Sequence, residues 1–125
     1  MQPPRRTRLL IVEDHDDTAA VLQLGLTDLG YEVALAHNGP LALQLAQTFA
    51  PDVAVLDIGL PVMDGWELAR RLRERCTGLQ VIAVTAFNDE DDRHRSDAAG
   101  FSYHLTKPVN IQAIHAAVQK LVPLV

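Results

Sequence analysis

The sequence has one cysteine, no excess of positive charge and no long apolar run, and each scarcity excludes a class of protein. Cys76 has no second cysteine with which to form an intrachain disulfide, which favours a reducing compartment, so we expect a cytoplasmic protein. The formal net charge of −5 argues against direct nucleic-acid binding. No run is long enough to span a bilayer and no secretory leader is visible, so we expect no membrane association.

What the sequence does contain is enough apolar material for one domain. Of its 125 residues, 48% are hydrophobic, which supports a real core. We expect residues 1–7, which carry two prolines and two arginines, to form a disordered tail, and residues 8–122 to form the domain. We expect no separate output domain within this length, so that either the output is a protein contact or the chain is a piece of something longer, and we expect a monomer or weak dimer.

Short apolar runs alternate with helical patterns along the chain. This alternation predicts an α/β fold, with a five-stranded parallel sheet and helices on both faces. Right-handed crossovers leave few topologies, and the flavodoxin-like strand order 2-1-3-4-5 is the one we predict. The strands are expected at residues 9–12, 31–36, 53–57, 81–84 and 101–105.

Polar side chains follow the apolar run of four of these strands. Glu13 and Asp14 follow the first strand and Asp57 ends the central one. Thr85 ends the fourth strand and Lys107 follows the fifth. Because the carboxyl ends of parallel strands meet at one edge of a sheet, where open α/β sheets bind ligands, we expect these side chains in one cleft.

Three carboxylates in one cleft repel each other. Two unit charges about 4 Å apart interact by about 4 kcal/mol at an effective dielectric constant of about 20. A raised pKa with a shared proton could offset this repulsion, and so could a hard cation; an all-oxygen site suits Mg²⁺. With the ammonium of Lys107 and the hydroxyl of Thr85, the set is fit for phosphoryl transfer, and Asp57 is the best candidate nucleophile.

At these positions the chain resembles the receiver domain of two-component response regulators. The resemblance covers residues 8 to about 122, nearly the whole chain. Each motif alone is weak, but four motifs in the right order, each at a strand end, are specific. The matching segments are Val12-Glu13-Asp14, Leu56-Asp57-Ile58-Gly59-Leu60-Pro61-Val62-Met63-Asp64-Gly65, Val84-Thr85-Ala86 and Leu105-Thr106-Lys107-Pro108.

The resemblance implies that Asp57 accepts a phosphoryl group from a phosphohistidine on a histidine kinase or phosphotransfer protein. The protein would then be a signalling switch rather than an enzyme, limited to its own phosphorylation and dephosphorylation. The resemblance also implies a cis peptide bond between Lys107 and Pro108. Further implied roles are direct Mg²⁺ ligation by Asp14, Asp57 and the carbonyl of Gly59, a largely water-mediated contact from Glu13, and phosphoryl binding by Thr85 and Lys107.

His104 departs from the commonest pattern of the family. Three residues before the lysine, many receivers carry a Tyr or Phe that turns inward on activation. We expect His104 to take part in the switch together with Thr85. Residues 88–97 contain no apolar side chain, so we expect this segment to be weakly held and to move on phosphorylation.

The first helical segment, residues 18–29, has a predicted core stripe at Leu22, Leu26 and Leu29. Val21 and Leu24 are also apolar but fall off this stripe. They are either scattered surface hydrophobics, which are common, or a patch that receives a helix of the phosphodonor.

The main alternative is a Mg²⁺-dependent phosphohydrolase acting through an aspartyl-phosphate. Haloacid-dehalogenase-type enzymes need a second Asp two residues after the nucleophile, and here that residue is Gly59. A flavin site is disfavoured by the acidic block after the first strand, and a pseudo-receiver by the full set of reactive residues. The remaining histidines lack metal-ligand spacing and are interpreted as surface residues: His15, His37, His94 and His115.

Overall fold

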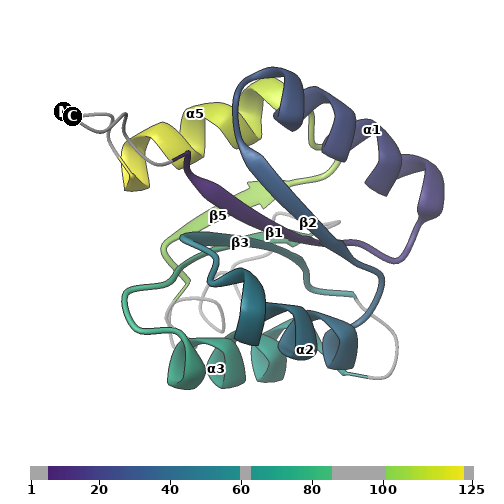
Figure 1. Cartoon of the computed structure of the whole chain (residues 1–125). Coiled ribbons are helices and arrows are strands. Elements are labelled where there is room, and N and C mark those ends of the chain that lie inside the picture. The colour runs from purple at the N-terminus through teal and green to yellow at the C-terminus, as the bar shows by residue number, and fades with distance from the viewer. Residues whose placement is uncertain (1–5, 60–62, 86–100, 123–125) are drawn as a thin grey trace, which may run out of the picture.

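Five parallel strands form the centre of the fold in the order β2-β1-β3-β4-β5, which confirms the predicted flavodoxin-like topology (Figure 1). The structure is a computed structural model that describes residues 6–59, 63–85 and 101–122. The strands are β1 (Arg8–Val12), β2 (Glu32–Ala36), β3 (Val53–Asp57), β4 (Gln80–Thr85) and β5 (Tyr103–Thr106).

The central strands β1, β3 and β4 are buried on both faces, which is why they are nearly continuous apolar runs rather than alternating ones. Successive side chains of a strand point to opposite faces. Leu10 and Val12 therefore belong to one core cluster, and Leu9 and Ile11 to the other. All four side chains are at most 1% exposed.

Helices cover both faces of the sheet (Figure 1). Among the described residues, α1 (Asp16–Asp28) and α5 (Ile111–Leu121) lie on one face, and α2 (Gly39–Phe49) and α3 (Gly65–Arg75) on the other. Side-chain oxygens of Asn38, Asp64 and Asn110 cap α2, α3 and α5 by accepting hydrogen bonds of 2.8–2.9 Å from backbone N–H groups. Such a cap is typically worth about 1 kcal/mol.

The end of α1 differs from the sequence prediction. Leu29 was predicted to face the core but is 42% exposed. The reason is that α1 already ends at Asp28, and that Gly30, with a φ of 101°, then turns the chain. Tyr31 is buried instead, and its hydroxyl lies 2.6 Å from Nδ1 of His115 on α5. His115 is half-buried, so its interpretation as a surface residue is wrong.

Two predicted segments lie largely outside the described residues. These are residues 88–97 and most of the expected tail at residues 1–7, of which only Arg6 and Thr7 are described. The carbonyl of Thr7 already accepts a hydrogen bond of 3.0 Å from the Glu32 amide. The helices that the structure describes are too short or too polar to cross a membrane.

Candidate functional site

Asp57 is the last residue of β3 and lies at the carboxyl edge of the sheet with 6% of its surface exposed. The Ile58 amide donates a hydrogen bond of 3.0 Å to the Val84 carbonyl, which holds the chain to β4 for one more residue. The chain then leaves the sheet, and the Gly59 amide donates to Oδ1 of Asp57 at 2.9 Å. The Asp57 carboxylate is therefore fixed by its own loop.

Lys107 pairs with Asp57 across the sheet edge. Its Nζ donates a hydrogen bond of 2.7 Å to Oδ2 of Asp57, and its backbone amide binds the Thr85 carbonyl at 2.7 Å. Burial disfavours the charged ammonium, but the hydrogen bond and charge of Asp57, with smaller contributions from Glu13 and Asp14, raise the pKa of Lys107 above its ordinary value. The lysine is thus held as a cation facing the predicted phosphoacceptor.

Glu13 is as buried as Asp57, with 6% of its surface exposed. Its amide binds the Ala36 carbonyl at 3.0 Å, and its Oε2 accepts a hydrogen bond of 3.1 Å from the Asp14 amide. Burial, followed by the hydrogen bond and the charge of Asp57, raises the pKa of Glu13 to about 7. Without a cation, this carboxyl is therefore still partly protonated near neutral pH.

The donor set at this edge suits a hard cation. Oδ1 of Asp14 is buried and accepts no hydrogen bond from the residues described here. Carboxylate oxygens and a nearby backbone carbonyl are the ligands that Mg²⁺ takes, usually together with water. The residues present therefore fit Mg²⁺, and a cation would favour the ionised form of Glu13, whose pKa is raised first by burial and then by Asp57.

The two predicted switch residues are in contact. Thr85 is 3% exposed, and its Oγ1 lies 2.9 Å from Nε2 of His104 on β5. This contact between β4 and β5 is present in the unphosphorylated chain.

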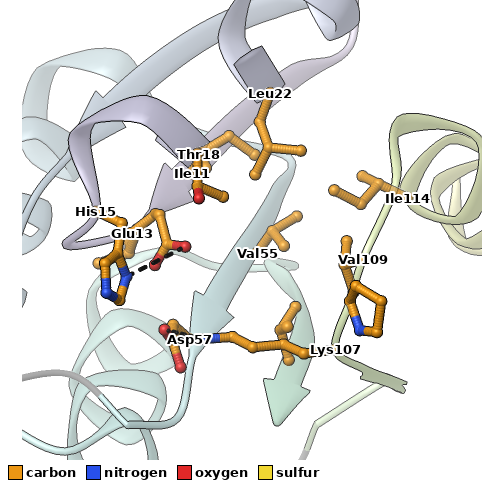
Figure 2. Close-up of a pocket in the computed structure, with 13 residues that line it drawn as sticks. Ile11, Glu13, His15, Thr18, Leu22, Val55, Asp57, Lys107, Val109 and Ile114 are labelled. Atoms are coloured by element: carbon orange, nitrogen blue, oxygen red, sulfur yellow. Dashed lines mark hydrogen bonds and ion pairs between the residues drawn. The ribbon is translucent and has the colours of Figure 1, made fainter. Parts of the chain in front are cut away.

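A cavity of about 540 Å³ adjoins the polar groups (Figure 2). Glu13, Asp57 and Lys107 lie at one end of it. Apolar side chains from α1, the central strands and α5 line the remainder, among them Leu22, Val55 and Ile114. An apolar surround lowers the local dielectric constant and strengthens the electrostatic interactions of the charged end.

Sequence reasoning misses two residues at this edge. His15 has no ligand spacing to other histidines, yet its Nδ1 lies 3.4 Å from Oδ1 of Asp14. The available signal is its place directly after the acidic pair. Gly65 begins α3 so close to β3 that a Cβ atom there would lie 2.8 Å from Cα of Ile58, which is a tertiary approach that no local pattern reveals.

Comparison with known proteins gives the family. The family described as "Response regulator receiver domain" matches residues 9–119. An uncharacterized 14.6 kDa protein of Leptolyngbya boryana is 40% identical over 88% of this chain and 86% of its own length. The transcriptional regulatory protein CusR of Escherichia coli is 37% identical over 91% of this chain, which spans 50% of CusR.

Solved structures agree with these relatives. A response regulator protein from Burkholderia pseudomallei, solved with a phosphorylated aspartic acid, a calcium ion and citrate, superposes with a TM-score of 0.84. It is 27% identical, over 90% of this chain and 66% of that one. The chain belongs to the response regulator receiver domain family.

Proposed function

We propose that this receiver domain accepts a phosphoryl group on Asp57 from a phosphohistidine of a histidine kinase or phosphotransfer protein. The observation that carries the proposal is the hydrogen bond of 2.7 Å between Lys107 Nζ and Asp57 Oδ2, in a cleft that also holds Glu13. The Burkholderia relative, which carries a phosphorylated aspartic acid, supports it. We also propose that the protein is cytoplasmic, which the single cysteine and the kind of donor support.

The transfer requires a nucleophile and positive charge. A carboxylate oxygen of Asp57 forms a bond to phosphorus while the bond from phosphorus to the donor's imidazole nitrogen breaks, and the imidazole leaves with that electron pair. The Lys107 ammonium, which now binds Asp57, is placed to bind the phosphoryl oxygens as they approach. The Thr85 hydroxyl at the neighbouring strand end is the proposed second donor.

Mg²⁺ would be held by Asp14, Asp57 and the carbonyl of Gly59, with Glu13 contacting it largely through water. When bound, it supplies positive charge to the carboxylates and the phosphoryl oxygens. The proposed role of Glu13 is to add a third carboxylate beside those of Asp14 and Asp57. Its pKa is raised to about 7, so a bound cation would favour its ionised form.

The proposed switch begins at Thr85. Binding of the Thr85 hydroxyl to a phosphoryl group competes with its contact of 2.9 Å to Nε2 of His104. Losing that contact would shift the equilibrium between two arrangements of His104 and of the residues that follow Thr85. Those residues, 86–99, lie outside the described part of the chain. Hydrogen exchange should then show residues 86–99 better protected once Asp57 is phosphorylated.

The proposed docking surface for the donor is on α1. Val21 and Leu24 are 60% and 69% exposed, as expected for side chains off the core stripe. Since α1 directly follows the acidic loop, a donor helix that covers them would bring its phosphohistidine toward the cleft.

Mass measurement after treatment with acetyl phosphate and Mg²⁺ tests the function. We expect one phosphoryl adduct on the wild type and none on Asp57→Asn, with unchanged circular dichroism because the substitution is nearly isosteric. An acid-stable, base-labile adduct on the variant would show that Asp57 is not the acceptor. Multiple turnovers of a phosphate ester would instead favour the phosphohydrolase.

A further inference from the structure

His15 lies beside the acidic pair, although the metal ligands implied for a receiver are all oxygen atoms. Its Nδ1 is 3.4 Å from Oδ1 of Asp14 and 3.9 Å from Oε1 of Glu13. One ligand atom from each of the three residues falls within 4.8 Å of the others. Figure 2 shows the His15 ring turned toward the Glu13 carboxylate at the mouth of the cavity.

The backbone of His15 is fixed at the start of α1, while its side chain is 70% exposed. His15 is the N-cap residue of α1, and its carbonyl accepts a hydrogen bond of 2.9 Å from the Ala19 amide. An N-cap side chain usually accepts a hydrogen bond from the first turn of its helix. The His15 side chain makes no such bond, and its ring is directed to the carboxylates instead.

Nitrogen and oxygen donors select different cations. Carboxylate, carbonyl and water ligands suit Mg²⁺, whereas imidazole suits the later divalent ions of the first transition series, such as Fe²⁺, Co²⁺, Ni²⁺ and Zn²⁺. At a given site the affinity also generally rises from Mn²⁺ to Cu²⁺ and is lower again for Zn²⁺. One imidazole within reach of two carboxylates therefore changes which ion the site prefers.

We propose that His15 supplies a nitrogen ligand beside Glu13 and Asp14, so that the cation site of this receiver binds later transition-series divalent ions in preference to Mg²⁺. The inference rests on the proposed function because it uses the same cation site. It adds the class of cation that the site selects. Co²⁺ is a suitable probe because its unpaired electrons shift the proton resonances of a coordinated imidazole far outside the normal range.

Calorimetric titration with Co²⁺ and with Mg²⁺ distinguishes two roles for His15, a metal ligand and a charged neighbour of Asp14. If His15 is a ligand, His15→Asn should weaken Co²⁺ binding by about tenfold or more, the usual loss when a group that tunes a metal site is removed, and leave Mg²⁺ binding nearly unchanged. If His15 acts only as a positive partner of Asp14, its removal should strengthen the binding of both ions alike, and the proposal is wrong.

His37 offers a matched control. Its Nδ1 lies 3.5 Å from Oδ1 of Asp16, so it is another exposed histidine beside a carboxylate, outside the acidic pair. His37→Asn should keep both affinities of the wild type and the shifted imidazole resonances of the Co²⁺ complex. His15→Asn should lose those resonances; if it keeps them, the nitrogen ligand is not His15.

A further variant distinguishes this proposal from the proposed function. Asp14→Asn should weaken both ions, since both use its carboxylate. If the wild type binds neither ion at millimolar concentration, the cation site fails, and the proposed function fails with it. If both ions bind, and His15→Asn changes neither the Co²⁺-to-Mg²⁺ affinity ratio nor the shifted resonances, only the inference about His15 is overturned.

Discussion

The Glu13 carboxyl should make the metal-free protein less stable as the pH rises. Its pKa is raised from an ordinary value of 4.5 to about 7, so between these two pH values the native state holds a proton that the unfolded chain releases. The free energy of unfolding should therefore fall across this window and level off above it. At about 1.4 kcal/mol per pKa unit, the fall attributable to Glu13 is about 3 kcal/mol.

Replacing Glu13 by Gln keeps the shape of the side chain and removes its ionisation. The variant should match the wild type near pH 4.5 and exceed its stability by up to about 3 kcal/mol at pH 8. That is a large part of the 5–15 kcal/mol typical of a domain. Lys107 does not confuse the measurement, because its pKa is raised above 10.5 and its stabilising charge is lost only at still higher pH.

Urea unfolding at several pH values with a chelator present, followed by fluorescence of the single tryptophan, measures this difference. Glu74→Gln is a suitable control, since Glu74 is an exposed carboxylate paired with Arg70 on α3, away from the sheet edge. Saturating Mg²⁺ should restore wild-type stability at pH 8, because a cation favours the ionised carboxylates. A Glu13→Gln variant with the full pH dependence of the wild type would refute the reasoning.

Three further predictions follow from the same contacts. Asp14→Ala should be at least as stable as wild type without metal and should lose the rise in Tm with Mg²⁺; an equal rise in both proteins contradicts this. In a double-mutant cycle of Thr85→Val and His104→Phe, the coupling free energy should be about 1 kcal/mol in the unphosphorylated protein, and a value near zero would show that their contact contributes nothing. Val21→Glu should slow phosphoryl transfer from a phosphohistidine donor but not from acetyl phosphate. The control Leu41→Glu, on the opposite helical layer, should slow neither transfer. If Val21→Glu slows transfer from both donors equally, the result counts against docking on α1.

The strand ends are predictable from sequence because one physical rule places them. A buried parallel strand reads as an apolar run, and all carboxyl ends of such strands share one edge, so the sequence alone brings Asp57, Thr85 and Lys107 together. His115 cannot be placed in this way. Its partner Tyr31 lies 84 positions away in the sequence, and the two meet only after α5 packs on the sheet.

The state of the Glu13 carboxyl also lies beyond local reasoning. Mutual repulsion of the acids allows either a raised pKa or a cation, and the sequence leaves both open. The structure shows how the two are linked, because burial and the neighbouring Asp57 raise the pKa of Glu13 in the absence of metal. The raised pKa reflects the free-energy cost of ionising Glu13, and binding of a cation would reduce that cost.

The backbone, more than the side chains, fixes the geometry of the charged edge. Beyond the last residue of β1, β3 and β5, the amides of Glu13, Ile58 and Lys107 still donate hydrogen bonds of 2.7–3.0 Å to a neighbouring strand or its end. These backbone bonds do not depend on the charge of any side chain. Substituting a single carboxylate should therefore change the electrostatic free energy of the site without displacing the remaining groups. This is why, when metal is absent, we expect Glu13→Gln to fold and gain stability, and Asp14→Ala to fold and be at least as stable as wild type.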